Sequence, residues 1–78
     1  MSGYNQKSIE SFFAEYGISD PDDKAKILPE ITDTIYNYNM AVIKVEKELD
    51  EYKKKQALVG VEEWHSKIEE IFTDFLNK

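Results

Sequence analysis

The stretch ITDTIYNYNMAVIKVEKELDEY, residues 31–52, decides the fold because its apolar residues repeat with a helical period. These residues form the seam, which consists of Ile31, Ile35, Tyr38, Val42, Val45, Leu49 and Tyr52. Their spacing alternates four and three, which keeps one face of an α-helix turned toward a partner helix for three heptads. We therefore expect the whole seam to be buried, so that Leu49→Ala costs about 2 to 4 kcal/mol of stability.

A second set of apolar residues, again spaced three and four apart, predicts the partner helix. Its members are Val61, Trp64, Ile68, Ile71 and Phe75. Gly60 is the nearest residue that commonly interrupts a helix between the two patterns. The sequence therefore predicts a long helix over residues 29–58 and a last helix over residues 61–77. Joined by a tight turn, they describe an antiparallel helical hairpin.

An N-terminal helix is predicted over residues 6–16, with its apolar residues on one face. These are Ile9, Phe12, Phe13 and Tyr16. Gly17 follows where a glycine in the left-handed conformation commonly ends a helix, and Ile18 then lies where a hydrophobic residue contacts the last turn. A structured end at Gly17 is therefore expected.

A short connecting helix is predicted over residues 21–27. Asp20 can cap its first amide groups, and Pro21 suits the first helical position. Pro29 cannot donate the helical hydrogen bond and disfavours helical angles at Leu28. We therefore expect the chain to break at Pro29. The prediction is an all-α protein, a small helical bundle that forms one domain over residues 1–78.

Composition narrows the classes of function. The chain has 78 residues, no cysteine and a net charge of −6, and all ten basic residues are lysines. Nucleic-acid binders normally present a basic face with arginines, so direct binding of nucleic acid is not expected. The first residues lack the basic start and apolar run of a signal peptide, and no stretch has the roughly 18 apolar residues of a membrane span. We expect a cytoplasmic protein without a membrane contact.

Catalytic and metal-binding patterns are absent or incomplete in the sequence. Glu62 and His65 have the spacing of a helical carboxylate–histidine pair, but both are expected one position off the apolar pattern, toward solvent. Residues 20–31 fail as a calcium loop, because Ala25 replaces the glycine and Ile31 the glutamate that such a loop needs. Only Ser66 is near the histidine in sequence, and adjacent helical residues point apart. We expect no catalytic residue, no metal and no cofactor.

An apolar stripe beside the seam is the candidate binding surface. Tyr36, Met40 and Ile43 are spaced four and three apart, and Tyr36 is two residues from Tyr38 of the seam, so the two tyrosines face different sides. Tyrosine is enriched at the centres of protein interfaces. We expect these three residues to bind a protein partner, as in a small adaptor, regulator or complex subunit. Because the last helix occupies the seam, a homodimer would also form through this stripe.

An acidic inhibitor or immunity-type protein is the alternative function. Such a protein would block a basic site on its target with a negative field. The residues that would supply the field are Glu10, Glu15, Asp20, Asp22, Asp23, Glu30 and Asp33. The two functions differ in salt dependence, because added salt screens exposed charges and hardly weakens an apolar contact.

Overall fold

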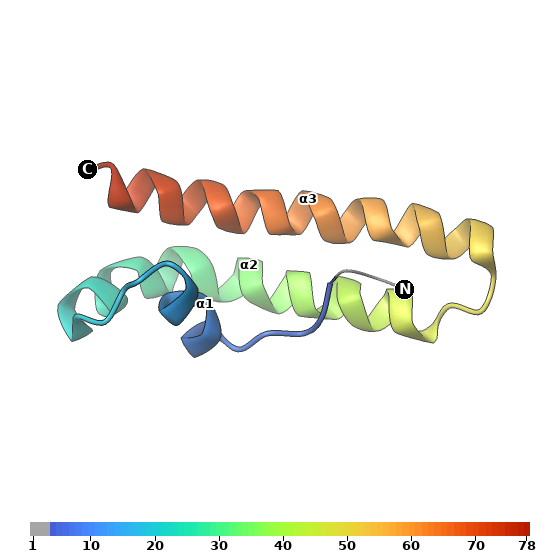
Figure 1. The fold of residues 1–78 in the computed structure, drawn as a ribbon, viewed down its shortest axis with the longest axis horizontal. Coiled ribbons are helices and arrows are strands. Elements are labelled where there is room, and N and C mark those ends of the chain that lie inside the picture. The colour runs from blue at the N-terminus through green and yellow to red at the C-terminus, as the bar shows by residue number, and fades with distance from the viewer. Residues whose placement is uncertain (1–3) are drawn as a thin grey trace.

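The computed structural model describes residues 4–78 as three helices in the order α1 (Ile9–Glu15), α2 (Pro21–Lys47) and α3 (Glu51–Leu76). Figure 1 shows α2 and α3 running antiparallel as the two arms of a hairpin, with α1 lying against one end of it. The described residues contain no strand, so the predicted all-α hairpin bundle is confirmed. Met1, Ser2 and Gly3 lie outside the described residues.

Helix α1 is shorter than predicted because it begins only after Ser8, which caps its N-terminus. The Ser8 hydroxyl accepts a hydrogen bond from the Ser11 amide, so the helix covers Ile9–Glu15 and not residues 6–16. At the other end Gly17 has a φ of 72°, as predicted. The Ile18 amide donates to the Phe13 carbonyl at 2.8 Å, and the Gly17 amide donates to the Ala14 carbonyl at 3.2 Å. These two bonds form a Schellman motif, which confirms the predicted end of the helix.

Helix α2 runs through Pro29, so the predicted break there is wrong. The helix begins after Asp20, whose carboxylate accepts a hydrogen bond from the Asp22 amide, and continues to Lys47. Ile27 and Ile31 lie on one face, on either side of Pro29, and both are fully buried. Their burial offsets the roughly 3 kcal/mol that a proline costs inside a helix. The predicted helices over residues 21–27 and 29–58 are therefore parts of one helix that ends earlier.

The turn of the hairpin lies at residues 48–50, so the predicted turn at Gly60 is also wrong. Glu48 has an extended backbone, and Asp50 caps α3 by accepting hydrogen bonds from the amides of Tyr52 and Lys53 at 2.9 and 3.1 Å. Gly60 lies inside α3, which covers Glu51–Leu76 and not only residues 61–77. With this turn the arms have 27 and 26 residues, so nearly every turn of one helix has a partner in the other.

The seam is therefore buried only as far as Val45. Leu49 lies in the turn with 93% of its surface exposed, and Tyr52 on α3 is 71% exposed. The expected cost of Leu49→Ala, about 2 to 4 kcal/mol, no longer holds, because an exposed side chain leaves no cavity when it is removed. The first five seam residues are buried as predicted.

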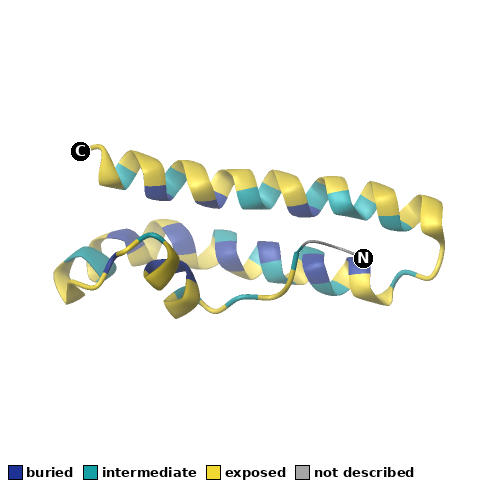
Figure 2. Cartoon of the chain, viewed as in Figure 1, coloured by how far each residue is buried: buried dark blue, intermediate teal, exposed yellow. Residues whose placement is uncertain are grey.

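The core lies between the three helices, and within residues 4–78 its buried side chains are apolar apart from the Tyr38 hydroxyl. Figure 2 shows the buried positions on the facing sides of α2 and α3 and on α1. Phe72 of α3 is fully buried and joins α1 to the hairpin, because its ring lies 6.4 Å from Phe12, 6.0 Å from Phe13 and 4.4 Å from Tyr16. Contacts of this kind contribute beyond the apolar area that they bury. Helix α1 is thus fastened by its rings to one face of the hairpin.

Candidate functional site

The predicted stripe lies on the outward side of α2, away from the core. Tyr36 is 63% exposed and Met40 is 47% exposed, while Ile43 is half-buried. Tyr38, two residues after Tyr36, is fully buried. Positions two residues apart on a helix differ by about 160° in direction. Tyr36 therefore points to solvent because Tyr38 points to the core, and Tyr36 and Met40 are the exposed members of the stripe.

One flank of α2 is covered by the segment before α1. The Lys7 amide donates to the Asn39 side-chain oxygen at 2.9 Å, and the Asn39 side-chain amide donates to the Lys7 carbonyl at 2.8 Å. The Tyr38 hydroxyl donates to the Asn5 carbonyl at 3.1 Å. These three bonds give backbone groups of Asn5 and Lys7 the partners that they would otherwise find in water. The segment before α1 is thus held against the same flank of the hairpin as α1.

The opposite flank of the hairpin carries a groove between α2 and α3. Asn37 is two residues from Asn39 and so faces away from the covered flank. Around Asn37 the groove is a shallow cavity of about 480 Å³. It is lined by Asn37, Met40, Ala41, Lys44, Gln56, Ala57, Gly60 and Trp64. Met40 belongs to both surfaces, because it stands at the rim between the groove and the stripe.

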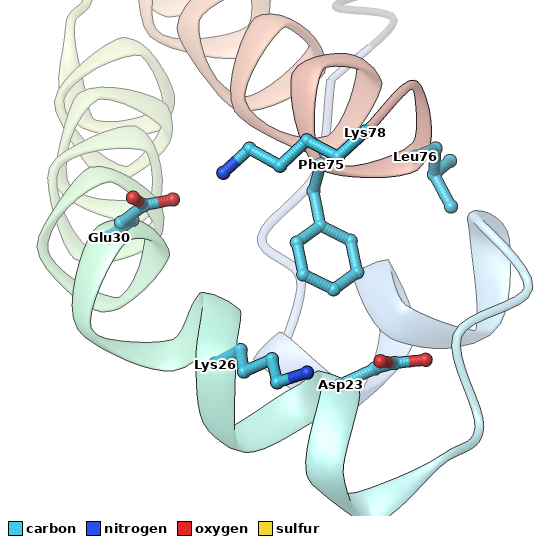
Figure 3. A pocket seen from close by; sticks show the side chains of 6 residues that line it. All are labelled: Asp23, Lys26, Glu30, Phe75, Leu76 and Lys78. Atoms are coloured by element: carbon cyan, nitrogen blue, oxygen red, sulfur yellow. The ribbon is translucent and has the colours of Figure 1, made fainter.

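A second cavity lies at the free ends of the two arms. It has a volume of about 610 Å³ and lies between the first turns of α2 and the end of α3. Figure 3 shows Phe75 pointing from α3 toward α2, where Asp23, Lys26 and Glu30 lie around it. The polar groups here are mixed in sign and stand on the surface, so the cavity does not resemble the mostly apolar, enclosed site of a small ligand.

His65 is half-buried and not turned to solvent as predicted. Its ring lies 5.4 Å from the ring of Tyr4 and 5.8 Å from that of Tyr38, and its Nδ1 lies 2.9 Å from a carboxylate oxygen of Glu69. The segment before α1 places Tyr4 over it, which the helical pattern alone does not show. Among residues 4–78 no three histidine, aspartate or glutamate side chains are grouped so that they could hold a metal ion.

The acidic surface is partly paired with lysines. The Lys24 amino group lies 3.2 Å from the carboxylate of Glu10, and that of Lys7 lies 3.3 Å from the carboxylate of Glu15. Both lysines also lie over phenylalanine rings of α1. The Lys7 amino group is 5.4 Å from the ring centre, and the Lys24 amino group is 5.6 Å from the centre of the other ring. Two of the seven acids considered for an inhibitory field therefore have cations beside them, which weakens the field around α1.

Two tyrosines have shifted acidities. Burial raises the pKa of Tyr38 above its usual value of 10.0, and the nearby Tyr4 and Glu15 raise it further. Burial also raises the pKa of Tyr16, with added effects of Glu69 and Glu15. A phenol that stays protonated remains a hydrogen-bond donor, as the bond from Tyr38 to Asn5 requires. Both groups therefore serve the fold, and neither lines the groove.

Comparison of the chain with protein-family models, with curated proteins and with solved structures finds no match in any of the three. Within residues 4–78, none of the helices is both long and apolar enough to cross a membrane. The fold and the site thus define an all-α helical hairpin with one covered flank, one open groove and an exposed apolar stripe.

The stripe was found from sequence alone, whereas the groove was not. Ala57, Gly60 and Trp64 follow one another at spacings of three and four, so they share a side of α3. This pattern was available in the sequence. It was hidden because Gly60 was interpreted as the end of a helix, which placed Ala57 and Trp64 on different elements.

Proposed function

We propose that this protein is a non-enzymatic interaction module, of the adaptor, regulator or complex-subunit kind, that binds another protein through the stripe on α2. The observation that carries the proposal is the exposure of Tyr36 and Met40, side by side on a helix whose opposite face is fully packed. Covering exposed apolar side chains with a partner removes them from water, which lowers the free energy and favours binding. The proposal includes the cytoplasmic location predicted from the sequence.

The chemistry of the stripe suits an interface centre. Tyrosine has only two rotatable side-chain bonds, so ordering it costs little entropy for the area that it buries. Methionine adapts its shape to a partner, and isoleucine adds a branched apolar surface beside it. The charged groups of α2 that flank the stripe, such as Asp33 and Lys47, can form a polar rim. A helical or flat apolar surface on the partner would match this arrangement.

The experiment compares three baits in a pull-down analysed by mass spectrometry. The parent is compared with a double variant, Tyr36→Glu with Ile43→Glu, and with Val59→Glu on the outward side of α3, where Val59 is 54% exposed. Met40 is left unchanged because it also lines the groove. A partner captured by the parent and by Val59→Glu, and lost by the double variant, supports the proposal. Equal recovery by all three baits contradicts it.

Salt dependence separates this function from the acidic inhibitor. Binding through the stripe should weaken little as salt rises from low to high concentration, since its contacts are apolar. Binding through the acidic residues should weaken steeply over the same range. Elution of the captured partner by salt alone, with the double variant still binding, would support the inhibitor and overturn the stripe.

A further inference from the structure

The segment before α1 is held on the hairpin through backbone groups. Asn39 pairs with both backbone groups of Lys7, since its side chain accepts from the amide at 2.9 Å and donates to the carbonyl at 2.8 Å. The Tyr38 hydroxyl donates to the Asn5 carbonyl at 3.1 Å. Amide and carbonyl groups of this kind are present in every peptide. These two side chains of α2 can therefore hold a non-helical segment of another protein by the same three bonds.

Only the first and last side chains of residues 4–7 are sheltered by the rest of the chain. Tyr4 and Lys7 are half-buried, and the two residues between them are exposed. The Tyr4 ring lies 5.4 Å from the ring of His65 on α3 and 6.4 Å, edge to face, from the ring of Tyr38 on α2. Aromatic rings at these distances attract one another. The hairpin therefore provides a position for an aromatic side chain beside the backbone contacts.

The Lys7 side chain marks a second position, for a basic residue, on α1. Its amino group lies 3.3 Å from the carboxylate of Glu15 and 5.4 Å from the centre of the Phe12 ring. A carboxylate and an aromatic ring together suit a lysine, and they suit the planar guanidinium of an arginine even better. The net charge of the chain, −6, also favours a basic ligand. The flank thus selects an aromatic and a basic side chain three residues apart.

We propose that this flank is a binding site for a segment of another protein, in which an aromatic residue is followed three residues later by a lysine or arginine. In the isolated chain, residues 4–7 occupy the site as an internal competitor. The site is separate from the stripe, because Tyr36, Met40 and Ile43 do not belong to it. Its occupation by a ligand therefore does not depend on whether the stripe binds a partner.

A segment of another protein can displace residues 4–7, whereas the same segment of a second copy has no advantage. An exchanged segment would make the contacts of the resident one, and joining two copies costs translational and rotational entropy. The internal segment has an effective concentration on the order of millimolar, so a competitor needs tighter side-chain contacts. A tryptophan in the position of Tyr4 buries more apolar area, and an arginine in the position of Lys7 can bind the Glu15 carboxylate through two hydrogen bonds.

Two synthetic peptides test the proposal by nuclear magnetic resonance. The probe is Trp-Asn-Gln-Arg-Ser, and the control is Arg-Asn-Gln-Trp-Ser, which has the same composition with the two key residues exchanged. Both peptides have blocked ends, so that no terminal charge contributes. They are added to the parent and to a double variant, Tyr4→Ser with Lys7→Ser, which weakens the internal segment and leaves the site unchanged. The signals of the His65 ring and of the Asn39 side-chain amide report binding.

The probe should bind the double variant at least about tenfold more tightly than the parent, since a site that is covered nine-tenths of the time loses about tenfold in affinity. The control peptide should bind the double variant at least about tenfold more weakly than the probe, because its basic and aromatic residues meet the wrong positions. Equal affinities of the two peptides overturn the proposal. So does a probe that shifts neither signal at about 10 mM.

The parent alone supplies a test that does not depend on the folding of a variant. The Lys7 amide is bonded to Asn39 while the internal segment is in place. Addition of the probe should speed hydrogen exchange of this amide in proportion to the fraction of protein bound, and addition of the control peptide should not. A probe that binds the parent and leaves the exchange of the Lys7 amide unchanged shows that it binds elsewhere, which overturns the proposal.

A matched pair of asparagine substitutions tests the backbone contact. Asn39→Asp, made in the double variant, keeps an acceptor and loses the donor to the peptide carbonyl, so the probe should bind about three- to tenfold more weakly. Asn37→Asp, made in the same double variant, adds the same charge on the opposite flank and should leave the affinity unchanged. The His65 ring signals measure both affinities. Equal effects of the two substitutions overturn the assignment of Asn39.

Discussion

Phe72→Ala should remove much of the stability of this protein, because the Phe72 ring joins α1 to the hairpin through three aromatic contacts. The side chain is fully buried, and its ring lies within 6.4 Å of Phe12, Phe13 and Tyr16. Truncation of a buried phenylalanine to alanine costs about 3 to 5 kcal/mol, from lost burial and the cavity left behind.

The whole chain has little stability in reserve. At about 0.05 to 0.15 kcal/mol per residue, a domain of 78 residues is stable by roughly 4 to 12 kcal/mol. Phe72→Ala can therefore leave the protein largely unfolded. Phe72→Leu, which keeps most of the volume and loses the ring contacts, gives a measurable loss of about 1 to 2 kcal/mol.

Urea unfolding followed by circular dichroism measures these losses, with Leu49→Ala as the control. Leu49 is an equally apolar residue that lies exposed in the turn, so its substitution should change stability by less than about 0.5 kcal/mol. A Phe72→Ala protein within about 1 kcal/mol of the parent would refute the packing of α1 on Phe72. A loss above about 2 kcal/mol for Leu49→Ala would refute the position of the turn.

Two further predictions concern backbone conformation and acidity. Gly17→Val should cost about 1 to 2 kcal/mol, since a β-branched residue resists the left-handed angle, whereas Gly60→Ala should add up to about 1 kcal/mol; equal shifts of the two unfolding midpoints would contradict this. The raised pKa of Tyr38 means that the folded state holds the phenol proton more tightly than the unfolded state. Its stabilising contribution is thus complete below pH 10.0 and is lost as pH rises through the folded pKa. Tyr38→Phe should make the alkaline fall in the urea midpoint shallower, and an unchanged slope would show that another group is responsible.

The hairpin could be predicted from sequence because it depends on apolar residues that repeat with the period of a helix. Ile31, Ile35, Tyr38, Val42 and Val45 must share one face in any helix, and a seam that is apolar over several turns needs a partner helix. The residue at which that helix ends could not be predicted from the apolar spacing. Leu49 continues the spacing, although it lies in the turn. The capping side chain of Asp50 decides between them, and its free energy is comparable to that of one apolar contact.

The break at Pro29 was predicted from the unfavourable effect of proline inside a helix. Packing of the helix against the core outweighs that effect. Ile27 is four residues before Ile31, so it extends the seam across the proline by one more turn. The penalty of a proline inside a helix is a few kcal/mol, which the burial of two isoleucines can match. A sequence pattern that continues on both sides of a proline therefore outweighs the proline itself.

The site was predictable only as far as it lies on one helix. The exposure of Tyr36 follows from its spacing to Tyr38 alone. The pairing of Asn39 with Lys7 joins residues 32 positions apart, and neither residue type indicates the other. The covered flank, and with it the open flank that holds the groove, depends on this contact. The groove therefore needed the structure, whereas the stripe did not.

Site-specific crosslinking in cells can show whether α2 presents its apolar stripe to a protein partner. A photoreactive phenylalanine analogue replaces Tyr36 in one variant and Val59 in another, both exposed side chains that tolerate an aromatic group. On irradiation in cells that express the protein, position 36 should give a discrete adduct of higher mass that position 59 does not give. No adduct at position 36, or the same adducts at both positions, would contradict the claim.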